Sequence, residues 1–349
     1  MSKTSIKSPQ PTPFELPVKK QLKVLLVGSG AVGQVFGLYL IEAGVELGFY
    51  ARPASADKLK QALEHGGIPL FQTSYFRRRD PIAHRLENYQ VVTDVAESQR
   101  FKPDQIWFTT PSPVYYSEWF REFLQKVPSE RVVCFAPEGG RSEFFPESGG
   151  EDRLVFGGIT FISWQGDLEG GSGRPEGVNF WLPPLLGIPL IGTEKACREV
   201  EELLKKAGFR TMVKKKDFHK TLASVTAVML AFVAGLELSG WSFRAFRKSP
   251  WLKRAACGSR EAVLSQLTGT GIFTRTLLRI LFSSTGFFLA TIFLPLLFPF
   301  DLEKYLKFHY LKTRDQTLTL LDVFARDGKR RGLPVENIQV LLQGLLDSA

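Results

Sequence analysis

The sequence predicts an α/β fold in which a doubly wound parallel sheet is followed by an all-helical domain. From residue 21 to about 216, short apolar runs alternate with amphipathic stretches, the pattern of strands alternating with covering helices. Beyond that point strand patterns fade and helical patterns replace them. The chain has 349 residues, more than one compact domain usually contains, so two domains are expected. We place a flexible tail at 1–20, a sheet domain at 21–215 and a helical domain at 216–349.

The composition restricts the class of protein. With 44% hydrophobic and 23% charged residues, the chain is neither mainly disordered nor fibrous. Its net charge of +10 favours anionic partners, without choosing between phosphates, lipid headgroups and nucleic acid. Three cysteines without a C-x-x-C pair suit a reducing compartment, so we expect a cytoplasmic protein. The tail holds four prolines and no continuous apolar run, unlike a secretory signal.

Each element is predicted from its local pattern. Buried strands are expected where apolar residues run together, and helices where they recur every three or four positions. The expected strands are 23–27, 45–50, 105–110, 131–136 and 154–163. The expected helices are 31–43, a stretch through Tyr115 and Phe123, 194–207, 221–238, 253–267 and 302–326.

The turn Gly28-Ser29-Gly30-Ala31-Val32-Gly33 directly follows the first expected strand and opens the first expected helix. In such a turn the first glycine makes the tight bend, the second lets the backbone approach a pyrophosphate, and the third lets the helix pack closely on the strand. The helix start then offers free N–H groups and a positive dipole end to the phosphates. We therefore expect a Rossmann domain in which these six residues hold a dinucleotide.

The tip of the second expected strand indicates which dinucleotide binds. Units that bind NAD usually place Asp or Glu about 20 residues beyond the glycine turn, on the ribose hydroxyls. Here the strand ends Tyr50-Ala51-Arg52, with Lys58 and Lys60 nearby and no carboxylate. A guanidinium at this place can hold two oxygens of a 2′-phosphate. We therefore predict NADP(H); the alternative is that Arg52 is an ordinary solvated charge.

The GSGAVG turn, Arg52 and a helical domain that opens with the sequence DFHKTL resemble the ketopantoate reductase family over about residues 22–345. The segment 332–337 resembles the family's last helix junction. The resemblance implies reduction of a 2-keto acid by NADPH between the two domains. It makes Lys220 the catalytic lysine that protonates the carbonyl oxygen, a task that needs a proton and a positive charge. The alternative is that Lys220 is a surface cation beside the basic run 214–216.

Several family positions have changed in this chain. Ser224 stands where the family has asparagine, Lys304 where it has serine, and Gln316 where it has glutamate. Glu138 falls where the family's asparagine-glycine pair faces the nicotinamide. We predict Glu138 as a cofactor contact, and the other three as substrate contacts. Because glutamine cannot carry charge or act as a base, the changes predict a substrate other than ketopantoate, or a catalytically degenerate NADP-binding protein.

Residues 280–300 form an apolar stretch without charge. Its length would permit a membrane span, but Pro295 and Pro299 interrupt it and it leads directly towards Gln316. We expect a buried helix pair within the helical domain. The alternatives are an interfacial surface, on a membrane or in a homodimer, and a true membrane span. Basic residues on both sides of the stretch suit the interfacial alternative.

The sequence lacks the motifs of several other kinds of functional site. The four histidines are far apart and form no ligand pair, so no metal site is expected. The sequence contains no G-x-S-x-G elbow and no P-loop. Basic triplets at 77–79, 214–216 and 329–331 lack interleaved aromatic residues, so nucleic acid is not an expected partner. A small-molecule substrate is the expected partner, a homodimer is left open, and an amino- or opine-type dehydrogenase is the remaining alternative.

Overall fold

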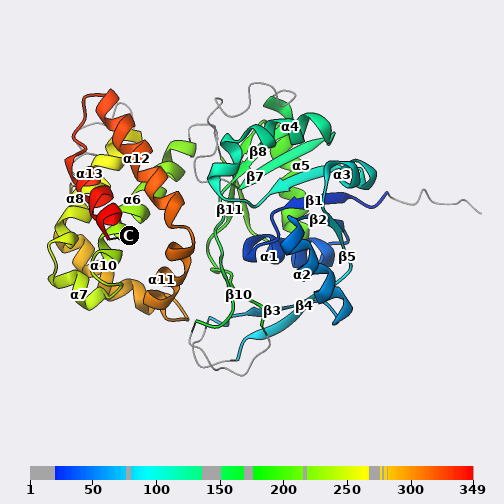
Figure 1. Ribbon diagram of the computed structural model, residues 1–349, viewed down its shortest axis with the longest axis horizontal. Coiled ribbons are helices and arrows are strands. Elements are labelled where there is room, and N and C mark those ends of the chain that lie inside the picture. The colour runs from blue at the N-terminus through cyan, green and yellow to red at the C-terminus, as the bar shows by residue number, and fades with distance from the viewer. Residues whose placement is uncertain are drawn as a thin grey trace, which may run out of the picture.

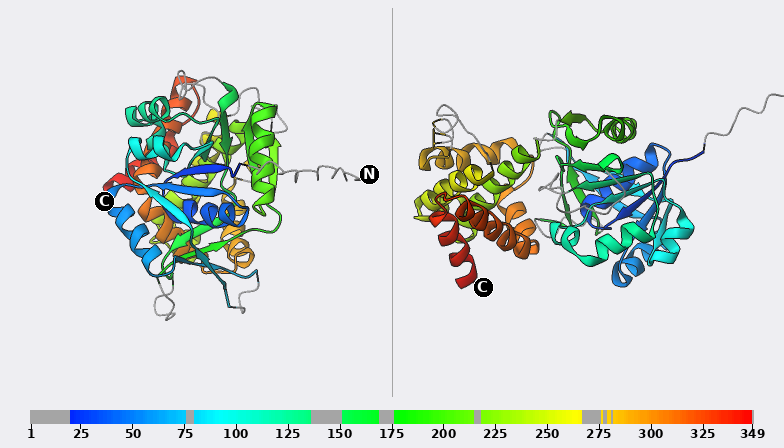
Figure 2. Two further views of the ribbon diagram at one scale, coloured as in Figure 1. Left: turned by 90° about the vertical axis from the view of Figure 1, so that its right-hand side faces the viewer. Right: turned by 90° about the horizontal axis from the view of Figure 1, so that it is seen from above.

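The computed structural model describes residues 20–75, 80–135, 151–168, 176–214, 218–266, 276, 279–280 and 282–348. Within these residues the last strand ends at Lys214, and only helices follow from Phe218. Figure 1 shows the strands with their covering helices on the right and the helical domain on the left. Figure 2 shows the same two parts from the side and from above. The predicted fold class is confirmed, while the predicted tail, except Lys20, lies outside the described residues.

The elements of the sheet domain follow in chain order. They are β1 (Lys23–Val27), α1 (Ala31–Glu42), β2 (Glu46–Tyr50), α2 (Pro53–Glu64), β3 (Ile68–Gln72), β4 (Ile82–Leu86), β5 (Tyr89–Val92), α3 (Val95–Phe101), β6 (Gln105–Phe108), η1 (Ser112–Tyr116), α4 (Glu118–Lys126), β7 (Arg131–Phe135), η3 (Glu151–Arg153), β8 (Leu154–Gly157), β9 (Ile162–Gln165), β10 (Val178–Trp181), β11 (Ile188–Gly192), α5 (Glu194–Lys206) and β12 (Thr211–Lys214). The helical domain contains α6 (Phe218–Glu237), α7 (Phe243–Lys248), α8 (Trp251–Gln266), α10 (Ser284–Leu297), α11 (Leu302–Lys312), α12 (Arg314–Arg330) and α13 (Glu336–Asp347).

An eight-stranded sheet forms the centre of the sheet domain, with strand order β12-β11-β8-β7-β6-β1-β2-β5. Neighbouring strands from β5 to β8 are parallel, and β11 joins β8 in the antiparallel direction. From β1 the chain adds β2 on one side and later β6 on the other. This reversal is the topological switch point, where open α/β sheets bind ligands beyond the carboxyl ends of their strands.

The strand predicted over 154–163 is in fact two strands in two different sheets. β8 ends at Gly157, where a Cβ atom would lie 2.7 Å from the Phe135 ring, so no larger residue fits there without a shift. β9 begins at Ile162 and pairs with β10 in a second, four-stranded sheet of order β4-β3-β10-β9. The single-strand prediction is wrong because the apolar pattern continues across the two glycines that let the chain change sheets.

Helix α1 packs between the two sheets and explains part of the phenylalanine content. The Phe36 ring stacks on Phe135 with ring centroids 4.4 Å apart, and meets Phe161 edge-on at 5.0 Å. Phe161 precedes β9, and Trp107 of β6 completes the group at 5.7 Å from Phe36. Mostly apolar rings fill this layer because it is covered on both sides, and the indole N–H of Trp107 donates to Gln105 at 2.8 Å.

The opposite face of the large sheet is covered by α3 and α4. Phe120 and Phe123 of α4 are buried against Phe108 of β6. The one helix predicted through Tyr115 and Phe123 is divided into η1 and α4. Ser117 makes the division, because its hydroxyl caps α4 by accepting a hydrogen bond from the backbone N–H of Phe120 at 3.3 Å.

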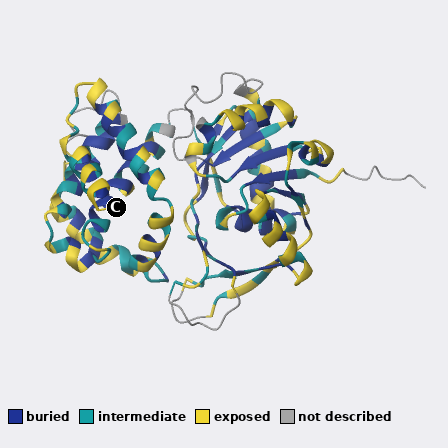
Figure 3. Ribbon diagram, in the orientation of Figure 1, coloured by how far each residue is buried: buried dark blue, intermediate teal, exposed yellow. Residues whose placement is uncertain are grey.

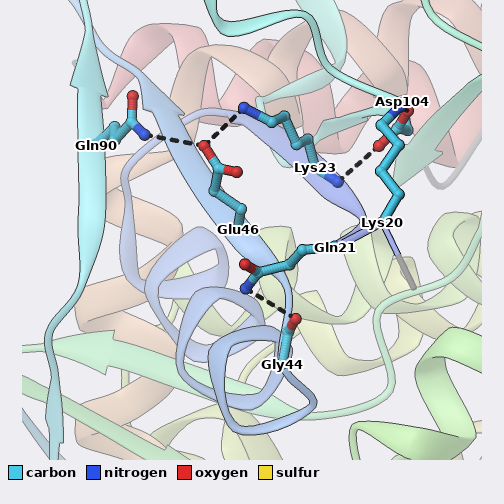
Figure 4. A network of polar contacts seen from close by, with 7 residues as sticks. All are labelled: Lys20, Gln21, Lys23, Gly44, Glu46, Gln90 and Asp104. Atoms are coloured by element: carbon cyan, nitrogen blue, oxygen red, sulfur yellow. Dashed lines mark hydrogen bonds and ion pairs between the residues drawn. The ribbon is translucent and has the colours of Figure 1, made fainter. Parts of the chain in front are cut away.

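Hydrogen bonds and ion pairs of charged side chains connect the amino ends of the central strands (Figure 4). Lys23 at the start of β1 donates from Nζ to Glu46 of β2 at 2.8 Å. The backbone N–H of Lys23 donates to the Asp104 carboxylate, just before β6, at 2.9 Å, and Lys20 pairs with the same carboxylate at 2.7 Å. These contacts join β1 to both of its neighbours at the edge of the sheet opposite the glycine turn.

Helix α6 is the central helix of the second domain and packs against α8, α12 and α13. A Cβ atom at Gly235 would lie 2.9 Å from Cβ of Ala255, which shows how closely α6 approaches α8. The helix predicted over 302–326 is wrong as one element, because it breaks into α11 and α12 at Thr313. Figure 3 shows the buried residues of this domain gathered on the inner faces of its helices.

Within the described residues, the two domains are in contact at two places. At one, the turn between α10 and α11 packs on the second sheet: Phe300 lies 4.9 Å from Trp164 of β9, and Phe298 lies 5.4 Å from Trp181 of β10. At the other, Leu222 in α6 lies beside Gly158, directly after β8, since a Cβ there would be 3.5 Å from Leu222. The start of α6 therefore lies at the carboxyl end of β8.

Candidate cofactor and active site

The glycine turn at the end of β1 has room for glycine alone at two of its three glycine positions. Gly28 has a φ of +109°, and a Cβ there would lie 2.9 Å from Oγ1 of Thr109. At Gly33, in the first turn of α1, a Cβ would lie 2.1 Å from the carbonyl oxygen of Gly28. The first and third glycines of the motif therefore have the steric roles that the sequence predicts.

The middle glycine is different, because it borders open space. A Cβ atom at Gly30 would meet no atom within 4 Å. Gly30 is also the N-cap of α1, where it makes no side-chain capping bond, and the first turn of the helix holds no acidic residue. The first N–H groups of α1 are thus left without a capping side chain among the described residues. Room, N–H donors and the positive dipole end suit a phosphate group.

A hydrogen bond between Gln34 and Ser29 links the first turn of α1 to the glycine turn. Nε2 of Gln34 donates a hydrogen bond to the carbonyl oxygen of Ser29 at 2.8 Å, which orients the peptide group before Gly30. Oε1 of the same buried amide has no hydrogen-bond partner among the described residues. Ala31 and Val32 begin α1 behind this contact and are partly buried against the core.

Two threonines after β6 belong to the site and were missed as functional residues by the sequence analysis. Oγ1 of Thr109 donates to the Gly28 carbonyl at 2.9 Å, and its backbone N–H donates to Val27 at 2.9 Å. The buried hydroxyl of Thr110 has no hydrogen-bond partner in the described part of the chain. Leaving such a group unpaired costs about 1–3 kcal/mol, which a bound ligand would offset. The available signal was that β6 and β1 end at the same edge of a doubly wound sheet.

Arg52 lies at the tip of β2, as the sequence predicts. It is the N-cap of α2, is exposed, and is followed by Pro53 in the first turn of that helix. Its guanidinium group makes no hydrogen bond or ion pair with any described residue. Lys58 and Lys60 are exposed on α2. Arg52 is therefore not paired with another side chain within the described residues, and its neighbours on α2 include Asp57 as well as the two lysines.

Lys220 and Ser224 lie one helical turn apart at the start of α6. Lys220 is the third residue of the helix, two positions before Leu222, which lies beside the end of β8. Ser224 is 9% exposed, and its hydroxyl donates to the Lys220 carbonyl oxygen at 2.7 Å. Because its proton is committed to the backbone, Ser224 is left with acceptor capacity towards a ligand.

Lys304 and Gln316 are not brought to Lys220. Arg314, two residues before Gln316, pairs with Glu237, the last residue of α6, at 2.7 Å. Since α6 has 20 residues it is about 30 Å long, so Gln316 lies towards the end of α6 opposite Lys220. Lys304 is on α11, exposed, with Asp301 at 3.9 Å. The structure therefore does not assemble the predicted substrate contacts into one set.

The remaining predictions lie partly outside the described residues. Glu138, the predicted contact beside the nicotinamide, is among them. Within the described ranges, no cluster of three or more His, Cys, Asp or Glu side chains could hold a metal ion. The side chains that the structure does bring to the carboxyl edge of the sheet come from the ends of β1, β2 and β6 and from the start of α6.

Comparison with known proteins finds similarity at the level of structure. No protein-family model matches the sequence, and no curated protein sequence matches it. A D-mandelate dehydrogenase solved with NADH and anilino(oxo)acetate is 14% identical, with a TM-score of 0.62 over 93% of this chain and 97% of that chain. The 2-dehydropantoate 2-reductase of Geobacter metallireducens is 14% identical, with a TM-score of 0.62 over 94% of this chain and 100% of that one.

A probable 2-dehydropantoate 2-reductase of Bacillus subtilis is 12% identical, with a TM-score of 0.63 over 93% of this chain and 99% of that chain. 2-Dehydropantoate is another name for ketopantoate. These proteins therefore carry the name of the family that the sequence resembles. These identities are low, so the comparison concerns the architecture and not the chemistry. Along more than nine-tenths of its length, the chain has the fold of the ketopantoate reductases, and the predicted resemblance is confirmed at that level.

Proposed function

We propose that the protein is an NADPH-dependent oxidoreductase that reduces a 2-keto acid or a related carbonyl compound. The observation that carries the proposal is the glycine turn: Gly30 borders open space at the uncapped start of α1, at the switch point of a doubly wound sheet. This arrangement offers room and N–H donors to a pyrophosphate. The bound cofactor would supply a hydride, while residues of this chain orient it and supply the proton.

The preference for NADPH over NADH rests on Arg52. A free, exposed guanidinium at the tip of β2 can pair with a 2′-phosphate through two parallel hydrogen bonds. In the sequence, no carboxylate follows β2 before Asp57 to accept hydrogen bonds from the ribose hydroxyls of NADH. The D-mandelate dehydrogenase of similar fold was solved with NADH, so the two cofactors need a direct comparison in this protein.

Lys220 is the proposed proton donor. Hydride addition to a carbonyl carbon leaves negative charge on the oxygen, which an adjacent ammonium group stabilises and then protonates. Lys220 lies near the end of β8, and Arg52 follows β2. In the sheet these strands are four spacings apart, about 19 Å at about 4.8 Å per strand. The separation suits an extended dinucleotide between the two cations, with its phosphates at the end of β1, one of the three strands between them.

The proposed substrate is not ketopantoate. Ser224 stands beside Lys220 as a hydrogen-bond acceptor, which suits a hydroxyl or ammonium group of the substrate better than its carboxylate. Lys304 and Gln316 replace two polar positions of the ketopantoate reductases. Gln316 lies towards the other end of α6, and Glu303, next to Lys304, accepts a hydrogen bond from the backbone N–H of Phe243, beyond that end. The proposed substrate-contact set is therefore reduced from three residues to Ser224.

The experiment that tests this function is turnover of a panel of 2-keto acids with NADPH, followed by the absorbance of the reduced nicotinamide. We expect oxidation of NADPH with at least one branched or aromatic 2-keto acid, and less with ketopantoate. Product analysis should find the corresponding 2-hydroxy acid in equal amount. Absence of turnover across the panel, under conditions where NADPH binding is demonstrated, would contradict the proposal.

A second candidate function is cofactor binding without turnover. The observation that favours it is the separation of Lys220 from Lys304 and Gln316, which leaves the expected substrate contacts dispersed. Under this alternative the glycine turn and Arg52 would still bind NADPH. The panel assay distinguishes the two functions, because both predict binding and only the first predicts product.

A further inference from the structure

Helix α10 presents an apolar face to solvent. The sequence analysis expects a buried helix pair here, and the structure corrects that expectation. Phe287 and Thr291 are the buried residues of α10, and they fix it to the rest of the helical domain. The side chains of its other face are exposed, with 57% of Phe293 and 71% of Leu296 accessible. The exposed large apolar residues of this face, here named the α10 face, are Phe288, Leu289, Ile292, Phe293, Leu296 and Leu297.

The α10 face is continuous along the helix. Its six residues follow the spacing i, i+1, i+4, i+5, i+8 and i+9, which on an α-helix forms one stripe opposite Phe287 and Thr291. The described part of the chain places no other element over this stripe closely enough to bury it. Soluble proteins rarely expose an apolar patch of this kind, and such patches mark protein or membrane contacts.

The length of α10 and its bend towards α11 argue against a straight transmembrane path for this helix. The helix has 14 residues and is therefore about 21 Å long, shorter than the roughly 30 Å of a hydrocarbon core. α10 and α11 together would be long enough, but they are bent by 102° relative to each other. The one described helix that could span by length and composition is α6, of which 56% is buried inside the protein. Helix α10 by itself is therefore too short to cross the hydrocarbon core.

The charged residues that flank α10 in the sequence, and those on the neighbouring helix α7, are mostly basic. From Glu261 to Asp301 the sequence contains no other Asp or Glu. Helix α7, which packs beside α10, has three charged residues and all are basic: Arg244 and Lys248 are exposed, and Arg247 donates to the Thr291 carbonyl at 3.3 Å. Arg279 before α10, and Lys304 and Lys307 after it, are exposed as well, and Asp301 lies 3.9 Å from Lys304. The basic residues of this paragraph are here named the basic rim.

This charge pattern decides between a lipid surface and a second copy of the chain. In a two-fold symmetric dimer built on the α10 face, each copy would bring the same basic rim against its partner, and like charges would repel. An anionic lipid surface is complementary to the rim, and each Lys or Arg near such a surface strengthens binding. We propose that the α10 face docks on an anionic membrane surface, with its apolar side chains among the headgroups and its basic rim on the phosphates.

The proposal is independent of the proposed reductase activity, and co-sedimentation with lipid vesicles tests it. The full-length protein is mixed with vesicles of phosphatidylcholine and phosphatidylserine, or of phosphatidylcholine alone. We expect the protein to pellet with the mixed vesicles, and at least about tenfold more weakly with the neutral ones. Raising the salt from about 0.1 M to about 1 M, which shortens the Debye length from about 10 Å to about 3 Å, should release most of it.

Matched variants locate the contact. Phe293→Glu combined with Leu296→Glu should reduce binding to mixed vesicles at least about tenfold, because it places charge within the apolar stripe. The control replaces Leu185 and Leu186 by Glu, since these exposed leucines lie before β11 in the sheet domain. The control should bind as the natural sequence does. Thermal unfolding of both variants shows that they are folded, as substitutions of exposed residues should be.

Three results would overturn the proposal. The first is that the natural sequence does not pellet with mixed vesicles. The second is that the α10 variant pellets as well as the control does. The third is that analytical ultracentrifugation finds the natural sequence as a dimer and the α10 variant as a monomer, while neither of these two proteins binds vesicles. The third result would assign the α10 face to a second copy of the chain.

Discussion

Oγ1 of Thr109, after β6, donates a hydrogen bond of 2.9 Å to the carbonyl oxygen of Gly28, after β1. The bond joins the two strand ends that flank the switch point and fixes the first peptide group of the glycine turn. A Cβ at Gly28 or at Gly33 would also approach this hydroxyl to 2.9 Å. The conformation of the turn thus depends on a residue about 80 positions away in the sequence as well as on its own glycines.

Thr109→Val should loosen the turn without unfolding the sheet. The substitution preserves shape but removes a hydrogen bond worth about 1 kcal/mol, and it leaves the Gly28 carbonyl short of a donor. We expect NADPH to bind about fivefold more weakly, measured by fluorescence titration. Thr109→Ser, which keeps the hydroxyl, is the control. Equal affinity in the valine and serine variants would show that the bond does not position the turn.

Alanine at Gly33 should lower stability, whereas alanine at Gly30 should lower the affinity for NADPH. At Gly33 the new Cβ would lie 2.1 Å from the Gly28 carbonyl oxygen, so we expect a loss of stability of about 3 kcal/mol or more. At Gly30 the Cβ meets no atom within 4 Å and φ is −73°, so the unfolding temperature should hardly change. The Gly30 variant should nevertheless bind NADPH at least about tenfold more weakly, because the Cβ occupies the space of the phosphates.

Thermal unfolding and NADPH titration of the two glycine variants check this contrast. A Gly30→Ala protein that binds NADPH normally would remove the phosphate site from the glycine turn. A Gly33→Ala protein as stable as the natural sequence would show that α1 can shift away from β1.

Lys220→Ala should lower kcat/KM for the best 2-keto acid by about 10²–10⁴-fold, the usual contribution of general acid catalysis. The affinity for NADPH should change less than twofold, because Lys220 lies beside β8 and away from the glycine turn. Lys253→Ala, on the exposed surface of α8, is the matched control for loss of one lysine. Activity in the Lys220 variant equal to that of the control would exclude Lys220 as the proton donor.

His309 should make the protein less stable in mild acid. Burial lowers the pKa of His309 to about 4, with a further contribution from Lys312, and its ring stacks on Tyr305 at 5.5 Å. In the unfolded chain the pKa is about 6.5, so between these values the unfolded state binds more protons. The contribution of His309 to the free energy of unfolding should therefore be largest above about pH 6.5, fall by about 3 kcal/mol as the pH decreases to about 4, and level off below that pH.

Urea unfolding between pH 4 and pH 8 measures this dependence, with His309→Phe as the comparison. The phenylalanine can retain the stacking on Tyr305 but cannot titrate, so its stability should vary less over the same range. Parallel profiles for the two proteins would assign the acid sensitivity to other groups.

The parts of the fold that the sequence predicts well are those specified by neighbouring residues. β1, the glycine turn, α1 and Arg52 lie within 30 consecutive residues, and their glycines have local steric roles. The second sheet was not predicted, because its strands pair over long separations: Phe71 of β3 faces Asn179 of β10. No short-range pattern records such a pairing, and β3 and β4 are too short to show clear alternation.

The candidate site could be predicted only on its cofactor side. Thr109 and Thr110 require knowledge that β6 lies next to β1, which strand order supplies and local pattern does not. Lys304 and Gln316 were placed by counting along the chain. Counting does not show that the start of α12 lies at the last residue of α6, where Arg314 meets Glu237.

The most direct test of the central claim is thermal unfolding of the full-length protein with NADPH, with NADH and without nucleotide. A ligand that binds the folded state alone adds about 2.7 kcal/mol of stability at a hundredfold excess over its Kd. We predict a clear rise of the unfolding temperature with NADPH, a smaller rise with NADH, and loss of the difference in Arg52→Ala. An unfolding temperature that neither nucleotide changes would contradict the assignment of the glycine turn as a dinucleotide site.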